Sequence, residues 1–516
     1  MLKSRALKAD MDMCSRPLFG KIILFSLPLV FTGILQLLYN AADIIVVGRF
    51  ADSNAMAAVG STGALVNLVI NLFIGLSVGA LAAMAQAIGS RDEKAAEKIV
   101  HTAILVSVIG GVIVGIFGYF MTETFLRWMK TPEDILPLSA IYLKIFFVGM
   151  PANLLYNFGA SILRACGDTK NPLIFLTLSG LVNVALNLVF VIVFKMSVAG
   201  VAWATIIAQA ISAVLVVICL SRRKGFGKLT IKRLRIDKGA LLKIMRIGLP
   251  AGIQSTIFSF SNVIIQSAIN SMGNAAMAGS AASASIEGFV YTSMNAVSQA
   301  ALTFTGQNYG ANKRKNCSIV LVQTMAITTV LGLVMGVSSY LAAPWLLKVY
   351  NTDPEVIKFG VQRLLVIGTT YFTCGLMEVL VGSLRGIGLS FTPMFVSIVG
   401  VCGVRILWIY TVFAATHNLI ALYLSYPVSW VITVIIHFVT LLIARNKAFA
   451  RLEKNKGNKD NNDKNNKNDN KDNFVTQNSG DGQRGSVKLW DNNDNKDNKD
   501  NFVTQNSVEG QQTSGI

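Results

Sequence analysis

A single carboxylate stands inside the apolar stretch 27–48, LPLVFTGILQLLYNAADIIVVG, near the start of the chain. Asp43 follows Asn40 by three residues and Gln36 by seven, so on a helix the three polar side chains share one face. An ionised acid is costly in hydrocarbon and must face a protein interior or a water-filled cavity. The pattern is typical of a membrane protein that moves a proton or a cation. The alternative is a structural acid that is hydrogen-bonded to Asn40 or to a neighbouring helix.

Asparagines of the apolar stretch 172–194 could supply further oxygen ligands. Asn183 and Asn187 follow Ser179 at steps of four residues, so these side chains also share one helical face. We predict a site for H⁺ or Na⁺ that is formed by Asp43, Gln36, Asn40, Asn183 and Asn187. The alternative is that the asparagines only join one helix to another.

Two more acids stand in apolar surroundings in the second half of the chain. Glu287 shares a helical face with Tyr291 and Asn295, and Glu378 lies seven residues before Arg385. Either acid could hold a proton or attract a cationic compound. We predict a substrate site or second acidic site formed by Glu287, Glu378, Tyr291 and Asn295. One of the two glutamates could instead pair with Arg405 and be structural.

The elements that must position these residues are membrane-spanning helices. The chain has 516 residues, of which 53% are hydrophobic and 14% charged, and its mean hydropathy is +0.54. A span needs about 20 apolar residues. Twelve spans are predicted at 20–48, 57–88, 98–121, 136–165, 172–194, 198–221, 240–272, 276–309, 317–345, 355–386, 391–415 and 418–444.

The basic residues predict the orientation of these spans. A net charge of +19 would suggest a nucleic-acid partner in a soluble protein, but here the basic residues fall in short loops between apolar runs. They concentrate at the N-terminus and in the even-numbered loops, with ten in the sixth loop, from Arg222 to Arg246. The even loops and both termini are therefore predicted to be cytoplasmic, and the expected partner is the lipid bilayer rather than nucleic acid.

The chain contains an internal repeat. Each half holds six predicted spans, an even number, so both halves enter and leave the membrane on the same side and the repeats are parallel. The pairs of equivalent residues, 221 or 222 positions apart, are Pro28 with Pro250, Asn40 with Asn262, Gln86 with Gln307, Gly89 with Gly310, Arg164 with Arg385, Gly167 with Gly388 and Pro172 with Pro393. We expect an all-α integral membrane protein with twelve transmembrane helices in two parallel six-helix repeats.

The repeat and the composition divide the chain into five parts. These are a cytoplasmic N-terminus (1–19), an N-terminal six-helix lobe (20–221), a basic cytoplasmic linker (222–246), a C-terminal six-helix lobe (247–445) and a low-complexity cytoplasmic tail (446–516). The tail is rich in Asn, Asp and Lys and has almost nothing to bury, so it is predicted to be disordered.

Together these features resemble the multidrug and toxic compound extrusion (MATE) family. The marks are Pro28 and Pro250 near the starts of spans 1 and 7, Asp43 fifteen residues after Pro28, and an LRxxGxxxxP turn at 163–172 and again at 384–393. The resemblance implies an antiporter that exports organic, often cationic compounds, driven by inward H⁺ or Na⁺, with the acid of span 1 in a cation or proton site.

The chain also departs from the pattern of that family. Many relatives have an aspartate where this chain has Asn187, and a glutamate where it has Phe258. The first departure leaves Asp43 as the one acid of its site. The second means that an acidic site in the C-terminal lobe would have to use Glu287 and Glu378.

The expected function is therefore a secondary active exporter of organic compounds, working by alternating access as a monomer in a bacterial cytoplasmic membrane. A flippase for lipid-linked precursors is the alternative, and it should line its cleft with Arg and Lys. A membrane-embedded transferase is disfavoured because no nucleophile–base set is evident, so we expect no enzymatic activity. No cofactor is expected beyond the coupling ion, and the six scattered cysteines suggest no firm metal site.

Overall fold

The computed structural model describes residues 11–50 and 53–476, and the regular structure within these ranges is entirely helical. The chain divides into a large unit, Met1–Glu453, and a second unit, Lys454–Ile516. All the residues predicted to do chemistry lie in the large unit, and it is within this unit that the two lobes are found.

The N-terminal lobe comprises α1 to α7, and each predicted span of this half is found as a helix or a pair of helical segments. The elements are α1 (Phe19–Phe50), α2 (Ser53–Gly89), α3 (Glu93–Trp128), α4 (Leu136–Val148), α5 (Met150–Ala165), α6 (Lys170–Leu188), the π-helical segment η1 (Val189–Val193) and α7 (Ser197–Arg222). A short 3-10 segment, η2 (Ile231–Arg233), lies in the basic linker.

The C-terminal lobe comprises α8 to α16 and the part of α17 that ends at Glu453. Its elements are α8 (Lys238–Asn270), α9 (Asn274–Gly310), α10 (Arg314–Leu341), α11 (Ala343–Lys348), α12 (Pro354–Arg363), η3 (Leu364–Gly368), α13 (Thr369–Gly386), α14 (Phe391–Ser397), η4 (Ile398–Gly403), α15 (Val404–Trp408), η5 (Ile409–Phe413), α16 (Ala414–Thr416) and α17 (Leu419–Thr476). Segments η3, η4 and η5 are π-helical, so the tenth and eleventh predicted spans are irregular helices.

The helices have the length and composition of membrane spans. Among the described residues nine are long and apolar enough to cross a bilayer, and the pair α4–α5, bent by 48°, adds a tenth when it is counted as one broken span. Helices α8 and α9 have 33 and 37 residues, about 50 Å or more at 1.5 Å per residue, but are not among the nine. They would complete the predicted set, and the count of twelve stays a prediction.

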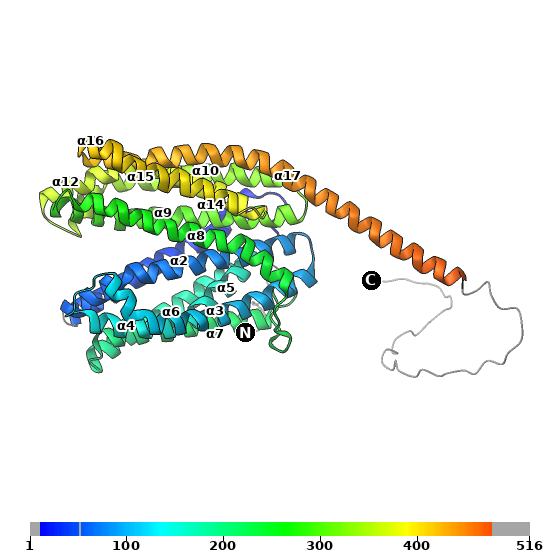
Figure 1. Ribbon diagram of the computed structural model, residues 1–516, viewed down its shortest axis with the longest axis horizontal. Helices are drawn as coiled ribbons and strands as arrows, with labels where there is room; N and C mark the ends of the chain where they lie inside the picture. The colour runs from blue at the N-terminus through cyan, green and yellow to red at the C-terminus, as the bar shows by residue number, and fades with distance from the viewer. Residues whose placement is uncertain (1–10, 51–52, 477–516) are drawn as a thin grey trace, which may run out of the picture. The chain divides into compact units, whose positions relative to one another are not determined.

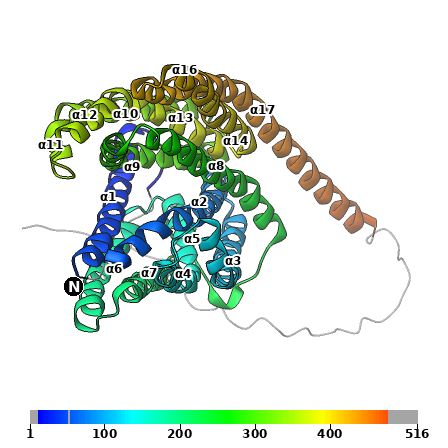
Figure 2. The same cartoon turned by 60° about the vertical axis from the view of Figure 1, so that its left-hand side comes forward.

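The two lobes form separate groups of helices that meet along α1, α2, α8 and α9. Figure 1 shows α2 to α7 in one group and α9 to α16 in the other. The principal contacts between the lobes join α2 to α8, α2 to α9 and α1 to α9. Helix α1 also packs on α6 of its own lobe, and Figure 2 shows it crossing from one group to the other.

Glycines bring α2 and α8 into backbone contact. A Cβ atom on Gly75 would lie 2.3 Å from the backbone of Gly252, and one on Gly79 would lie 2.2 Å from the carbonyl oxygen of Ile244. Small residues are the usual means by which membrane helices approach closely. This contact lies toward the end of the lobes that carries the basic loops, called the inner end because the sequence predicts it to be cytoplasmic.

The repeated LRxxGxxxxP sequences form the same turn in both lobes. Gly167 and Gly388 follow the ends of α5 and α13 with φ angles of +87° and +88°, a conformation that glycine adopts without strain. The N–H of Gly167 donates to the carbonyl of Arg164, and that of Gly388 donates to the carbonyl of Arg385, both at 2.9 Å. The turn therefore explains the glycine of the motif and fixes the two arginines in equivalent places.

The tail differs in part from the sequence prediction. The structure continues α17 as far as Thr476, so the first part of the segment 446–516, predicted to be disordered, is helical. The first residues of this segment include Ala and Lys, which have high helix propensity, and they directly follow a membrane-spanning helix. The remainder, 477–516, lies outside the described residues.

Candidate functional site

Asp43 lies where three helices of the N-terminal lobe meet. Its carboxylate, on the outer half of α1, faces α6 and α7: Asn187 donates a hydrogen bond to Oδ1 at 2.5 Å, and the Thr205 hydroxyl lies 3.5 Å from Oδ2. Asn183 completes the group, since it accepts a hydrogen bond from Asn187 and donates one to Thr205, each at 3.3 Å. The structure thus brings together three of the five residues predicted for the ion site.

One oxygen of this group has no donor among the described residues. The Asn187 side chain is fully buried, and no residue in 11–50 or 53–476 forms a hydrogen bond with its Oδ1. A buried acceptor left unsatisfied costs about 1–3 kcal/mol, so such an oxygen usually marks a place where a ligand or water binds. Beside the half-buried carboxylate of Asp43, it gives a set of oxygen atoms whose chemistry suits a proton or a monovalent cation.

The other two predicted residues do not join the group. Gln36 and Asn40 are exposed on α1. Between them Tyr39 turns toward α6, where its hydroxyl donates to the carbonyl of Thr177 at 3.3 Å. Its ring lies over Gly180, at which a Cβ atom would come within 1.9 Å. This glycine therefore lets α1 approach α6 closely enough for Asp43 to reach Asn187.

Two residues near Asp43 were missed by sequence reasoning. Thr205 lies on α7, in a stretch whose spacing gave no polar pattern, and Tyr142 on α4 lies close enough for the Asp43 charge to act on its phenol. Both are isolated polar residues in apolar helices. Only the folding of α4 and α7 against α1 reveals them.

Glu287 is held in a buried ion pair. Arg363 of α12 donates to both carboxylate oxygens, from Nε to Oε1 and from Nη2 to Oε2, each at 2.9 Å. The side chains of Arg363 and Glu287 are only 7% and 6% exposed. The sequence left open whether Glu287 or Glu378 pairs with Arg405; in the structure the partner of Glu287 is Arg363, which stands in the tenth predicted span.

Aromatic rings surround the cations of the C-terminal lobe. The Arg363 guanidinium lies 5.6 Å from the ring centroid of Tyr423 and 5.8 Å from that of Tyr426. Arg405 is 4.1 Å from the Tyr426 centroid and 5.4 Å from that of Trp430. Within the described residues Arg405 has no ion pair. Such stacking stabilises a cation that lacks a carboxylate partner.

Glu378 lies close to another arginine and to the tyrosine of the predicted second site. It stands on α13, near enough to Arg385 and Tyr291 for their charges to interact, but no ion pair of Glu378 occurs in the described part of the chain. Tyr291 is 40% exposed, and its hydroxyl lies close to the Asn295 side chain. Three predicted residues, Glu378, Tyr291 and Asn295, therefore lie together, while Glu287 is engaged elsewhere.

At the inner end the two lobes are joined by a reciprocal pair of hydrogen bonds, the glutamine seal. Gln86 of α2 donates to the carbonyl of Gly386, and Gln307 of α9 donates to the carbonyl of Ala165, each at 2.8 Å. The two bonds are equivalent under the sequence repeat. At Gly89 and Gly310 the same helices touch so closely that a Cβ atom would lie 1.9 and 2.2 Å from the opposite backbone.

The outer ends of the lobes are not joined in this way. Among the described residues the outermost hydrogen bond between lobes is the one from Asn71 to Ser259, at 3.4 Å, near the middle of α2. The apolar cluster that contains Val46, Val59 and Val198 belongs to the N-terminal lobe alone. In the described part of the chain, the hydrogen bonds between the lobes therefore lie between the middle of the helices and the inner end.

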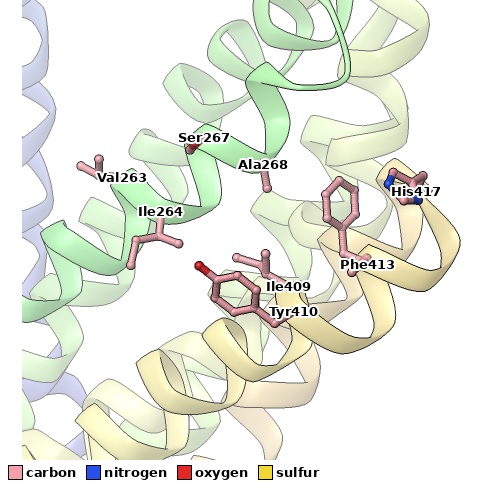
Figure 3. A pocket seen from close by; sticks show the side chains of 9 residues that line it. Val263, Ile264, Ser267, Ala268, Ile409, Tyr410, Phe413 and His417 are labelled. Atoms are coloured by element: carbon pink, nitrogen blue, oxygen red, sulfur yellow. The ribbon is translucent and has the colours of Figure 1, made fainter.

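Figure 3 shows an apolar groove on the outer part of the C-terminal lobe, with Ile264 of α8 facing Tyr410 of η5. Its volume is about 550 Å³. The lining residues are Val263, Ile264, Ser267, Ala268, Ile409, Tyr410, Phe413, Ala414 and His417. None of the predicted site residues belongs to it, so we do not assign the groove to the ion site or the substrate site.

Comparison with known proteins agrees with this architecture of two helical repeats. The MatE family model matches twice, at residues 28–189 and 250–411, once in each lobe. The chain is 26% identical over 424 residues to the probable multidrug resistance protein YoeA of Bacillus subtilis, covering 80% of this chain and 91% of YoeA. It is 23% identical over 400 residues to the probable multidrug resistance protein NorM of Thermotoga maritima, covering 75% and 84%.

A solved structure has the same fold. It is that of a multidrug resistance MATE family transporter of the MOP superfamily, and it superposes with a TM-score of 0.80 over 86% of this chain and 99% of the other at 20% identity. The fold and the duplicated family match define a multi-span membrane transporter of the cell membrane. The chain belongs to the multidrug and toxic compound extrusion (MATE) family.

Proposed function

We propose that the protein is a secondary active exporter that moves organic compounds out of the cell in exchange for H⁺ or Na⁺. The observation that carries the coupling step is the site at Asp43, where Asn187 is hydrogen-bonded to the carboxylate through its amide nitrogen and its Oδ1 has no partner among the described residues. A transporter that must bind and release a cation needs such incompletely satisfied oxygens. The neighbouring Asn183 and Thr205 hold both groups in place.

The site is placed so that binding of an ion can act on the contact between the lobes. Helix α1 carries Asp43 on its outer half, against α6 and α7. Its inner half packs on the other lobe, where Phe25 contacts the ring of Phe304 on α9 with centroids 5.6 Å apart. Neutralising Asp43 would change the attachment of α1 to the first lobe and, through the same helix, its packing on the second. Pro28 lies between the two regions.

Alternating access then consists of opening the inner end and closing the outer end. The two bonds of the glutamine seal join the lobes at the inner end, which supports the interpretation of this state as one that releases its substrate outward. The membrane potential is adequate for the work, since one charge moved through 100 mV is worth about 2.3 kcal/mol. The substrate site would involve Glu378, Tyr291 and Asn295 on the side of the C-terminal lobe.

Replacing Asp43 tests this proposal. Asp43→Asn keeps the hydrogen-bonding shape but removes the charge, so gradient-driven efflux from proteoliposomes should be lost while substrate binding to the purified protein is retained. Imposed pH and Na⁺ gradients are applied in turn to identify the ion. Asn40→Asp is a useful control, because it places an acid three residues away on the same helix, outside the Asn187 group, and should not restore coupling to Asp43→Asn.

Unchanged gradient-driven efflux by Asp43→Asn would contradict the assignment. Loss of folding is checked by the elution profile of the detergent-solubilised protein. The same proteoliposomes also test the transporter role itself, since a wild-type protein that moves no organic compound under either gradient would exclude the exporter.

A further inference from the structure

Two arginines stand where the lobes meet, immediately outward of the glutamine seal. Arg164 is the penultimate residue of α5 and Arg385 that of α13, so they are equivalent under the sequence repeat. The residues that follow them, Ala165 and Gly386, are the acceptors of the seal. The repeat thus places one guanidinium on each lobe beside the same contact.

Both arginines turn toward helices that join the lobes. Arg164 crosses from the N-terminal lobe and donates from Nη1 to Oε1 of Gln299 on α9 at 3.0 Å. Arg385 donates from Nη2 to Oε1 of Gln254 on α8 at 2.9 Å. Gln299 in turn donates to Asn295 at 2.9 Å, which connects Arg164 to the polar face of α9.

Each guanidinium uses little of its hydrogen-bonding capacity. A guanidinium has five N–H donors, yet Arg164 and Arg385 each donate to a single neutral amide oxygen in the described structure. The Nε atom of each is buried and has no partner in the part of the chain that the structure describes. A glutamine could supply one hydrogen bond to an amide, so bridging of helices does not explain why both positions hold a permanent cation.

The charges in this region do not balance. Glu378 lies close to Arg385, but no carboxylate forms an ion pair with either arginine among the described residues. Of the two arginines, Glu378 interacts with Arg385 alone, and Arg164 has no acid near it among the described residues. The C-terminal ends of α5 and α13 offer only the partial negative charge of a helix dipole. A charged group turned into protein at such a place needs an anion or water as its partner.

We propose that Arg164 and Arg385 form an oxyanion-accepting site at the inner end of the transport path, which favours organic substrates that carry a carboxylate or phosphate group. Arginine is suited to this role because its planar donors match the oxygens of both groups. The site would hold the anionic end of a substrate while its remaining part lies along Tyr291 and Asn295 of α9. The inference rests on the proposed exporter function and specifies its substrate class.

The test uses a matched pair of compounds. One is a fluorescent xanthene dye with a free carboxylate, and the other is its methyl ester, which has the same ring system and lacks the anion. Binding to the purified protein and counterflow in liposomes are measured for both. Arg164→Gln and Arg385→Gln should each weaken binding of the acid by roughly ten-fold, the scale of a lost charge-assisted hydrogen bond, and leave the ester within about two-fold.

Arg445→Gln is the matched control. Arg445 on α17 has a buried Nε without a partner and donates to one neutral side chain, Ser318, at 2.7 Å, but it lies away from the contact between the lobes. It should bind both dyes as the wild type does. Arg164→Lys keeps the charge and should retain part of the preference for the acid, which separates a role in binding from a failure to fold.

Several outcomes would overturn the site. If the acid and the ester weaken equally in Arg164→Gln and Arg385→Gln, the arginines only hold the helices together. If neither compound weakens, they accept no anion. The binding measurement is repeated in anionic and in neutral phospholipid to show whether the oxyanion comes from a solute or from a lipid headgroup. If the site accepts a headgroup, anionic phospholipid competes with the acid and weakens its binding. A wild type that binds the acid better but transports neither dye would contradict the exporter and retain the site.

Discussion

The buried ion pair of Glu287 and Arg363 allows a direct test of how charges in the C-terminal lobe affect the free energy of unfolding. The pair has two hydrogen bonds of 2.9 Å and side chains at most 7% exposed, so neither charge has water as a substitute partner. Replacing Glu287 by Met leaves a buried guanidinium that cannot lose its proton. Removing one partner of such a pair costs about 3–5 kcal/mol in the free energy of unfolding.

The reverse substitution should be milder. In Arg363→Met the carboxyl group of Glu287 can neutralise itself by taking up a proton, whereas arginine stays charged in proteins. In the double variant both charges are absent, and apolar side chains of similar volume often replace a buried pair at little cost. We therefore expect the order of stability wild type, double variant, Arg363→Met and Glu287→Met, with the first two within about 2 kcal/mol.

Unfolding by a denaturing detergent, followed by intrinsic fluorescence, measures these differences. The exposed pair of Arg127 and Glu133 is the control: its nitrogen–oxygen distance is also short, 3.0 Å, but its side chains are 59% and 77% exposed. Glu133→Gln should cost about 0–1 kcal/mol. A Glu287→Met protein as stable as the wild type would refute the reasoning. A stable double variant that has lost gradient-driven efflux would instead show that Glu287 takes part in transport.

Two further predictions concern the contact between the lobes. Gly79→Ala would place a Cβ atom 2.2 Å from a backbone oxygen of α8 and should lower the thermal stability of the purified protein. Gly60→Ala on the same helix is the control and should not lower it, because a Cβ atom there has nothing within 4 Å. Equal stability of the two variants would contradict the contact. Replacing Gln86 and Gln307 together by Ala removes both hydrogen bonds of the glutamine seal, each of which contributes about 0.5–1.5 kcal/mol. The labelling of cysteines introduced at the inner end should therefore increase. Unchanged labelling would show that helix packing alone keeps the lobes together.

Much of the scaffold could be predicted because each span is a separate apolar run. The predicted spans 20–48 and 57–88 correspond to α1 (Phe19–Phe50) and α2 (Ser53–Gly89), and the basic loops separate them from their neighbours. The repeat could also be read from the sequence, because its turns need glycine at particular backbone conformations. The π-helical segments could not be predicted, since their extra residue per turn leaves no signal in an apolar sequence.

The candidate site was only partly predictable, for a related reason. Asp43, Asn183 and Asn187 stand out as polar residues at helical spacing, and the structure joins them. Spacing shows which side chains share the face of one helix, but it does not show which helix that face meets. The partner of Glu287 could not be identified for this reason, and neither could the role of Thr205, because both depend on contacts between helices far apart in the sequence.

The repeat markers have a physical meaning that the sequence alone did not disclose. Gln86 and Gln307 are equivalent residues, and in the structure each binds the lobe opposite to its own. A duplicated scaffold joined by equivalent bonds can open and close its inner end symmetrically. The charged groups have no such symmetry, because the acid at Asp43 has no counterpart at Ile265, and Glu287 is neutralised by Arg363.

This asymmetry assigns different tasks to the two lobes. In the N-terminal lobe the Oδ1 of Asn187, next to Asp43 in the hydrogen-bonded group, has no partner among the described residues, and under the proposed function an ion binds there and changes how α1 is held. In the C-terminal lobe the pairing of Glu287 with Arg363 makes this acid costly to release for transport. If an ion bound equally to both lobes, its effect on the contact between them would not pass through one particular helix. Helix α1 carries Asp43 and also packs on α9, so we expect that binding at one lobe is transmitted to the other through this helix.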